Sequence, residues 1–596
     1  MSGSLPITGP GAQPWSWPPV WWRRWHRADL RGDLTAGVVV AVMLVPQSLA
    51  YATLAGLPVQ AGLLASVLPL LAYAVFGDSR TLSVGPAAIT SLMVGHALSA
   101  LAVPGSAHYL LLSAALAAAS GLLMLILGML RMGFLSQLLS RPVVQGFTVA
   151  SALLISLGQL GPLLGGAGLG HTLPAMLQSV VAAWRAEGVW AWADVGTGVA
   201  SLLALWLGPQ LIRLAATRWA ADDLGVLASR LWPLVVLAGG SIAAWMGHQH
   251  GGWLPKVVGD LHLDGVLQTW SGAASHLDWA AARALALPVL MVSLIGFVSS
   301  MSVAQAFAFK QGDRVDADRE LLGLGLANVG AAAVGGLAVA GGLSRTVVNE
   351  AAGARSPLAG VITSGLLVLL IALLLPVLAW LPKASLAAVI IMAVLNLVSF
   401  KPWVQAWSYD RAEAGAFAST LLGVLLLGFD VGLLVGLVWS LAALVWRHSQ
   451  PHMAEVGRVP GTEHFRNVDR HRVERLTGVL MVRVDESLAF TNIHRVEQGI
   501  GELLAHRPGT QALVLNMGAV NHIDQTALHA LEELEKGLHQ QGVTLYLTDI
   551  KGPVMDRLQS TPWMQRMNAQ VFLSAQQAWE SLSGAGSSSL ISTPQE

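Results

Sequence analysis

The stretch GGLSRTVVNE, residues 341–350, places an arginine shortly after two glycines in a chain that is otherwise strongly apolar. Of the 596 residues, 54% are hydrophobic and 11% are charged, and the mean hydropathy is +0.60. Ordinary soluble domains carry about 25% charged residues. The composition therefore predicts a polytopic α-helical membrane protein, in which a permanently charged Arg345 requires a functional or structural reason.

Apolar stretches of roughly 20 residues recur between Leu34 and Trp446, and each is long enough to cross a hydrocarbon core about 30 Å thick. We count about fourteen such spans, several of them short. Basic side chains gather in alternate loops, so the positive-inside rule places these loops and both chain ends in the cytoplasm. We predict a transmembrane domain at 31–448 in an inner (plasma) membrane, preceded at 1–30 by a tail and an interfacial anchor rich in tryptophan and arginine.

The character of the sequence changes after residue 448, where charged residues become frequent. We predict a linker at 449–459 and a small cytoplasmic α/β domain at 460–582. The runs GVLMVRV, ALVLNM and VTLYLTDI are typical of buried strands, and QTALHALEELEKGLHQQG is typical of an amphipathic helix that ends at Gly542. Residues 583–596, rich in serine and glycine, are predicted to be a disordered tail.

Several function classes find no support in the composition. The net charge is zero and no long basic run is present, so nucleic acid is not indicated as a partner. The chain contains no cysteine, which rules out disulfides, thiolate metal sites and cysteine nucleophiles. The histidines have no metal-ligand spacing, and metalloprotease, Walker and nucleophile-elbow motifs are absent. We therefore expect no metal, no cofactor and no enzymatic activity.

The two halves of the apolar region share a pattern. Gly85 lies 38 residues after Gln47 (85 minus 47), and Gly342 lies 42 residues after Ser300 (342 minus 300). In both cases a glycine precedes a short helix-prone run, as in the discontinuous helices of transporters built from inverted repeats. Glycine pairs are common in membrane helices, so the spacing alone leaves the repeat open.

A helix that begins inside the bilayer explains a nearby arginine. Its first amides lack intrahelical partners and carry about half a positive charge. Two such ends together with Arg345 would supply about two positive charges, which suits a divalent oxyanion. The structural alternative is that Arg345 pairs with Glu350 or with backbone carbonyls.

Gln47 and Tyr51 lie four residues apart, on one face of the first span. An amide and a hydroxyl on that face could bind the same ligand. The alternative is that both make hydrogen bonds between helices and that Pro46 only kinks the span.

Several motifs resemble the sulfate permease (SulP) family of anion transporters: VPQSLAYATLAGLP, FGDSRTLSVGPAA, DRELLGLGLANVG, GGLSRTVVNEAAGARSPLAG and LAAVIIMAV. The runs LMVRVDESLAFTN and VNHIDQTALHALEEL resemble the STAS domain of that family. The resemblance implies about fourteen spans in two inverted repeats of about seven helices, arranged as a core and a gate domain, and a homodimer. It also implies that the anion is held between the short third and tenth helices, at Gln47, Tyr51, Ala87, Leu343, Ser344 and Arg345.

Two positions depart from the family pattern. Ser299, which we retain as a candidate substrate-binding residue, stands where many members have a glutamate associated with proton coupling. Because a serine hydroxyl does not titrate near neutral pH, exchange, sodium coupling or uniport become candidates, unless Glu350 or Asp313 carries the proton. In the STAS loop, Asp524 is followed by Gln525 and Thr526 instead of the usual acceptor serine, so phosphoswitching is not expected. This candidate regulatory loop could bind an anion or a nucleotide, or the domain could serve dimer contacts and trafficking.

The sequence thus predicts a secondary transporter of inorganic anions that works by alternating access, with sulfate as the first candidate. Bicarbonate, chloride and dicarboxylates are alternatives within the same family. A nucleobase carrier is disfavoured, because such carriers use glutamates where this chain has Ser299 and Ser344. An anion sensor or scaffold that signals through the STAS domain is the alternative of another class. The expected partners are a small anion, a coupling ion, membrane lipid and a second copy of the chain.

Overall fold

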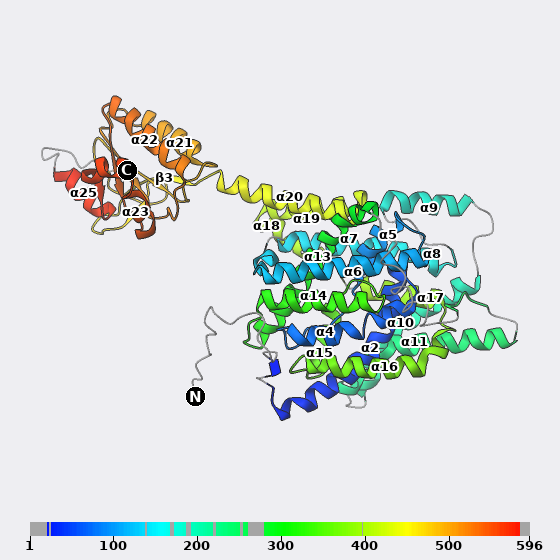
Figure 1. Ribbon diagram of the computed structural model, residues 1–596. Helices are drawn as coiled ribbons and strands as arrows, with labels where there is room; N and C mark the ends of the chain where they lie inside the picture. Colours follow the sequence, from blue (N-terminus) through cyan, green and yellow to red (C-terminus); the bar gives the residue numbers. More distant parts are fainter. Residues whose placement is uncertain are drawn as a thin grey trace. The chain divides into compact units, whose positions relative to one another are not determined.

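The computed structural model describes residues 21–584, apart from 23–24, 138–139, 167–171, 186–191, 219–221, 251–253, 260–278 and 396. The predicted tails, except for their inner ends, lie outside the described residues. The chain divides into two compact units, Met1–Ser440 and Leu441–Glu596. Figure 1 shows a helical first unit, and the second contains a sheet.

The helices of the first unit form two sets by their mutual contacts. We call the first set the core group, and it comprises α2 (Leu30–Leu54), α3 (Val59–Leu64), α4 (Leu68–Phe76), α5 (Ala88–Ser99), α6 (Ala107–Met129), α13 (Trp279–Lys310), α14 (Ala317–Ala333), α15 (Leu343–Ala351) and α16 (Leu358–Leu378). We call the second set the gate group, and it comprises α7 (Arg141–Gly158), α8 (Leu160–Leu163), α9 (Leu173–Arg185), α10 (Trp192–Arg218), α11 (Asp222–His250), α17 (Lys383–Leu395), α18 (Lys401–Tyr409) and α19 (Arg411–Leu427). A further helix, α20 (Phe429–His448), ends in the second unit, and short 3-10 turns lie at η1 (Arg27–Asp29) and η2 (Gly133–Gln137).

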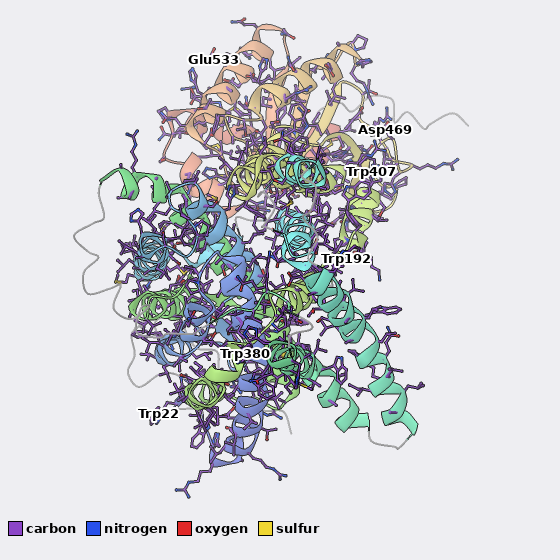
Figure 2. The ribbon with its side chains drawn as sticks, turned by 90° about the vertical axis from the view of Figure 1, so that its right-hand side faces the viewer. Trp22, Trp192, Trp380, Trp407, Asp469 and Glu533 are labelled. Atoms are coloured by element: carbon purple, nitrogen blue, oxygen red, sulfur yellow. The ribbon has the colours of Figure 1, made fainter. Side chains whose placement is uncertain are left out.

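Among the described residues, seven helices are long and apolar enough to cross a membrane, and four apolar helices are shorter. Two of the shorter ones are α5 and α17. The count of about fourteen spans stays a prediction, because helix length alone does not count crossings made by such short helices. Tryptophans lie at the surface, as interfacial anchors do: Figure 2 labels Trp22, Trp192 and Trp407, which are 63%, 78% and 56% exposed.

Glycines set the distance between helices in the core group. A Cβ added to Gly121 of α6 would lie 2.7 Å from the carbonyl oxygen of Gly325 in α14. A Cβ on Gly325 would likewise lie 2.9 Å from the Gly121 carbonyl oxygen. Small residues at this crossing let the two backbones touch, which is how membrane helices gain van der Waals contact without a hydrophobic driving force.

Two buried carboxylates tie loops to the core group. Asp33, on α2, accepts the Ser356 backbone N–H at 3.0 Å and its hydroxyl at 2.7 Å, just before α16. Glu320, on α14, accepts the Tyr73 hydroxyl at 2.8 Å and the backbone N–H of Asp78 at 3.3 Å. Both carboxylates are fully buried, so these hydrogen bonds offset their desolvation and fix the loops that they hold.

The second unit contains a six-stranded sheet in the order β4-β3-β5-β6-β7-β8. Its strands are β3 (Met453–Arg458), β4 (Phe465–Asn467), β5 (Val479–Val484), β6 (Ala512–Asn516), β7 (Thr544–Thr548) and β8 (Val571–Phe572). Neighbours from β5 to β8 run parallel, and β3 is antiparallel to both of its neighbours. The helices are α21 (Ile493–Ala505), α22 (Gln525–Gln540), α23 (Gly552–Leu558), α24 (Pro562–Met567) and α25 (Ala575–Gly584), with a 3-10 turn at η4 (Asn568–Gln570).

The predicted strands and the amphipathic helix of this unit are confirmed as β5, β6, β7 and α22, and Gly542 after the helix has φ +73°. The predicted linker 449–459 needs correction, because β3 lies within it. Met453 of β3 pairs with Val484, so the segment is an integral strand of the sheet. Its strand character depends on this partner, which lies far along the sequence, and six residues alone give a weak local signal.

Candidate functional site

Two strands of two residues each interrupt the core group at the positions that the sequence repeat marks. β1 (Val84–Gly85) pairs antiparallel with β2 (Ala340–Gly341). α5 begins three residues after β1 ends, and α15 begins two residues after β2 ends. The residues that precede the two helices, Ala87 and Gly342, have extended backbones. The helices are therefore interrupted at Gly85 and Gly342, and the interruptions that the sequence predicted are confirmed.

This short ladder brings the N-terminal ends of α5 and α15 close together. Because the two strands are antiparallel, the helices leave the ladder in opposite directions. Neither helix has a hydrogen bond from a capping side chain at its N-terminus. The amides of both first turns thus present partial positive charge near the same point in the bundle.

Side chains from neighbouring helices hold the ladder in place. The Ser300 hydroxyl, on α13, accepts the backbone N–H of Gly341 at 2.8 Å. The Thr346 hydroxyl, on α15, accepts the backbone N–H of Ser83 at 3.2 Å. The Asn328 side chain, on α14, both donates to the Val339 carbonyl at 3.0 Å and accepts from its N–H at 2.9 Å. The position of the half-helices is therefore set by polar contacts from three different helices.

Arg345 lies within this arrangement and is only 1% exposed. Its Nη1 donates to the carbonyl of Pro86, and its Nη2 donates to the carbonyls of Gly85 at 3.1 Å and Ala340 at 3.3 Å. The guanidinium therefore ties together the chain segments that enter the two half-helices. Its Nε is buried and has no partner among the described residues.

The alternative that pairs Arg345 with Glu350 is wrong for this structure, because the Glu350 carboxylate accepts from Lys310 Nζ at 2.8 Å. The alternative that pairs it with backbone carbonyls is what the structure shows. Backbone carbonyls carry only partial charge, so the net positive charge of Arg345 remains beside the two helix ends.

A cavity of about 460 Å³ lies between the core group and the gate group. The helices that line it are α2, α10, α11, α15 and α17, and α2 contacts α11, α15 and α17, while α10 packs against α11 and α17 (Figure 1). The lining consists of Val42, Met43, Pro46, Gln47, Leu205, Trp206, Pro209, Gln210, Arg213, Ser229, Pro233, Leu234, Ser344, Val389, Met392 and Ala393. The cavity is mostly apolar with a few polar groups, which is typical of a small-ligand site.

Two of the predicted site residues, Gln47 and Ser344, line this cavity. The Oε1 of Gln47 is buried and has no hydrogen-bond partner among the described residues. Ser344 is exposed in the first turn of α15, two residues after its N-cap. The cavity therefore reaches the beginning of one half-helix.

The other predicted residues lie outside the cavity lining. Tyr51 is 7% exposed on α2, close enough to Arg345 for an electrostatic interaction. Leu343 is 50% exposed, and Ala87 is half-buried ahead of α5. Ser299 is half-buried and donates to the Gly296 carbonyl of its own helix at 3.3 Å.

Several residues that shape the site were missed by sequence reasoning. Ser300 and Asn328 hold the ladder, and Gln210 and Arg213 line the cavity from α10. Arg213 stands out in the sequence as a charged residue, but the positive-inside rule accounts for it equally well as a basic residue near a cytoplasmic loop. Only the packing of α10 against α11 and α17 shows that it reaches the cavity.

The candidate regulatory loop of the second unit is tied down by its aspartate. Asp524 precedes α22, and its carboxylate accepts the backbone N–H groups of Ala527 and Phe490, both at 2.8 Å. Gln525 and Thr526, the first residues of the helix, are exposed. A small cavity of about 150 Å³ is lined in part by Asp524 and Gln525.

Among the described residues, no group of three or more histidine, aspartate or glutamate side chains is placed to hold a metal ion. The half-helix ends, Gln47, Ser344 and Arg345 supply amides, a hydroxyl and a guanidinium group, which are groups that bind anions.

Comparison with known proteins agrees with this arrangement. Residues 30–420 match the sulfate permease family and residues 470–578 match the STAS domain. The chain belongs to the sulfate permease family. It is an integral membrane protein with a helical transport region followed by a STAS domain.

Named relatives cover most of the chain. It is 31% identical to a probable sulfate transporter of Mycobacterium tuberculosis over 558 residues, which covers 92% of this chain and 95% of the relative. It is also 31% identical to the probable sulfate transporter 4.2 of Arabidopsis thaliana over 540 residues, covering 88% of this chain and 77% of the relative.

Solved structures share the fold. The murine Solute Carrier 26 family member A9 anion transporter, in an inward-facing state, superimposes with a TM-score of 0.82 at 21% identity, covering 95% of this chain and 93% of that one. The transmembrane domain of a cyanobacterial bicarbonate transporter, BicA, superimposes with a TM-score of 0.57 at 22% identity, covering 70% and 98%.

Proposed function

We propose that the protein is a secondary transporter of small inorganic anions and that the cavity between the core and gate groups holds the anion. The observation that carries this proposal is the meeting of two uncapped half-helix N-termini beside a buried arginine, at a cavity that also exposes Ser344. Partial positive charge from both helix ends and the full charge of Arg345 make this place favourable for an anion. The protein's membership of the sulfate permease family supports the same conclusion.

Sulfate is the first candidate, because the curated relatives are named sulfate transporters. The structure named as a bicarbonate transporter makes bicarbonate the next candidate, followed by chloride and dicarboxylates. Amides and hydroxyls recognise negative charge and oxygen acceptors, and these features are common to all of these anions.

In this proposal Arg345 acts on the anion through its charge and through the backbone that it holds. Both of its Nη atoms are engaged by the carbonyls of Gly85, Pro86 and Ala340. Direct hydrogen bonds to the anion then come from the first-turn amides of α15 beside Ser344, from the Ser344 hydroxyl, and from the Gln47 amide group, while α5 contributes only the partial charge of its N-terminus.

Transport would follow from movement of the gate group against the core group, which would expose the anion to each side of the membrane in turn. α10 carries Arg213 towards the end of the helix at Arg218, and such basic segments lie on the cytoplasmic side. We therefore infer that the cavity opens to the cytoplasm and that both ends of the chain lie on the same side. The membrane would be the inner membrane of a bacterium. We also infer that the protein acts as a homodimer.

Coupling to a proton gradient is not favoured at the three positions that the sequence singles out for it. Ser299 cannot titrate near neutral pH, and the two acidic alternatives are engaged in ion pairs. Glu350 pairs with Lys310 at 2.8 Å, and Asp313 pairs with Arg80 at 2.9 Å. Exchange, sodium coupling or uniport are therefore the modes that we expect.

The test is uptake of labelled sulfate, bicarbonate, chloride and succinate by proteoliposomes of the full chain, each with and without an imposed proton or sodium gradient. We expect saturable sulfate uptake that does not require a proton gradient. Binding of anions without any flux would instead indicate a sensor that acts through the STAS domain, and the absence of both would refute the proposal.

A further inference from the structure

Arg213 lines the cavity from the gate side. It lies on α10 with Trp206 and Gln210, and the same cavity is lined by Gln47 of α2 and Ser344 of α15. The described residues of the lining include no aspartate or glutamate. The Arg213 side chain is exposed, and no described residue forms a hydrogen bond or an ion pair with it. An arginine facing an otherwise uncharged cavity is thus left without a counterion among the described residues.

The packing of α10 fixes this orientation. Trp232 of α11 donates from its indole Nε1 to the Ala204 carbonyl of α10 at 2.7 Å. A Cβ added to Gly208 would lie 2.0 Å from that same indole nitrogen, so the two helices are in direct contact here. Pro209, inside α10, removes one backbone donor and lines the cavity itself. Rotation of α10 that would turn Arg213 away from the cavity would therefore break the Trp232 contact.

The two arginines near the site differ in what they can do. The two Nη atoms of Arg345 serve backbone carbonyls, whereas the donors of Arg213 have no partner among the described residues. A cation that faces an apolar-walled cavity attracts anions strongly, because such walls focus its field. A guanidinium can also donate two parallel hydrogen bonds to an oxyanion.

We propose that Arg213 is a direct cationic contact for the transported anion, in addition to the charge that Arg345 supplies without contact, and that it makes the site prefer divalent oxyanions to monovalent anions. This inference rests on the proposed function. In it the core group contributes the helix ends, Gln47 and Ser344, while the gate group contributes Arg213. A dianion gains about twice as much as a monoanion from each positive charge, so an added cation raises its relative affinity.

The same contact would couple the binding of the anion to the movement of the gate group against the core group. Because Arg213 and Ser344 belong to different groups of helices, an anion held by both bridges the core and gate groups. Its charge would screen the repulsion between Arg213 and the positive helix ends, which otherwise disfavours their approach.

The experiment compares Arg213→Gln and Arg213→Lys with the wild-type chain in proteoliposomes. Initial uptake of labelled sulfate and labelled chloride is measured at the same concentration and the same membrane potential. Arg411→Gln is the matched control, because it removes the same charge from an exposed residue of α19 that does not line the cavity. Thermal unfolding of each purified variant checks that it is folded.

We expect Arg213→Gln to lower sulfate uptake by about tenfold and chloride uptake by about threefold or less, so that the ratio of sulfate to chloride falls. Arg213→Lys should lower sulfate uptake less than Arg213→Gln does, and Arg411→Gln should keep the wild-type ratio. An unchanged ratio in Arg213→Gln, or an equal loss for both anions, would overturn the inference while leaving the proposed function intact. If the wild-type chain carries neither anion, the proposed function itself fails.

If Arg213→Gln does not fold, a competition assay with Arg213→Lys addresses the same question. Unlabelled sulfate is titrated against chloride uptake by the wild-type chain and by Arg213→Lys. Because lysine keeps the charge but loses the paired donors, the inhibitory concentration of sulfate should rise by about threefold. No change in that concentration would count against a direct contact.

Discussion

The guanidinium of Arg345 lies so close to Gly342 that a Cβ added to Gly342 would meet Nη2 at 2.8 Å and Nε at 2.9 Å. The backbone of Gly342 has φ −96°, which any residue can adopt, so the requirement for glycine here is one of space. Arg345 cannot move aside freely, because the carbonyls of Gly85, Pro86 and Ala340 hold it. The side chain of Arg345 therefore requires a residue without a Cβ at position 342.

Gly342→Ala should displace the guanidinium from its carbonyl partners. We expect a loss of about 1–3 kcal/mol in the free energy of unfolding, as for other overpacked sites, and a marked fall in anion uptake. Thermal unfolding and proteoliposome uptake measure the two effects. Gly365→Ala is the control, since a Cβ at Gly365 has no atom within 4 Å. Wild-type behaviour of both variants would show that Arg345 adjusts without cost.

Arg345→Lys separates the charge of the side chain from its geometry. A lysine keeps the positive charge, but its single ammonium group cannot reproduce the planar fork that reaches three carbonyls. Each buried carbonyl that loses its donor costs about 1–3 kcal/mol. We expect lower thermal stability and reduced uptake of every anion in the panel. If Arg345→Lys transported anions as well as the wild-type chain does, the positioning role would be refuted and charge alone would suffice.

Ser299→Glu should make uptake depend on pH. The new carboxyl would lie half-buried on α13, whose neighbouring Ser300 holds β2, and could take up and release a proton as the site changes state. The measurement is initial sulfate uptake between pH 5 and pH 8, each value being compared with the wild-type profile. Ser299→Gln is the control of equal size that does not titrate. A profile in Ser299→Glu that matches this control would count against a coupling role at the position.

The stability of the second unit should fall in acid through Asp485. Partial burial would raise the pKa of this carboxyl, but hydrogen bonds from Arg483, at 2.5 and 2.9 Å, and from His452, at 2.8 Å, lower it below its usual 3.8. A lowered pKa in the folded state means that the stabilisation is complete above 3.8 and is lost as the pH falls below it. Asp485→Asn should therefore lower the free energy of unfolding by about 1 kcal/mol at pH 7, with the difference shrinking below pH 4.

Chemical denaturation of the full chain, followed by hydrogen exchange in the strand β5, measures this effect. Glu533→Gln is the control, because Glu533 also pairs with a cation, Lys536, but on the fully exposed surface of α22. A constant difference between Asp485→Asn and wild type across the acid range would show that the carboxylate charge does not matter.

Local sequence determined the class of this protein and the places where its helices break. Apolar runs predict membrane helices, because a chain in lipid must satisfy its backbone hydrogen bonds internally. Gly342 marks one interruption, because a Cβ there would lie 2.8 Å from Nη2 of Arg345. At Gly85 a Cβ would meet the guanidinium at an ordinary 3.6 Å, so space alone does not require the glycine there. Short apolar runs located β5, β6 and β7, and amphipathic periodicity located α22, because these patterns are complete within one segment.

Only the tertiary structure decided which groups meet. The partners of Arg345 are carbonyls more than 250 residues away, apart from Ala340, and no local pattern identifies them. β3 is a strand because it pairs with β5. Arg213 lines the cavity because α10, which carries it, is held by the contact with Trp232. The physical reason is that periodicity reports which face of a segment is apolar, whereas pairing and cavities depend on how separate segments pack.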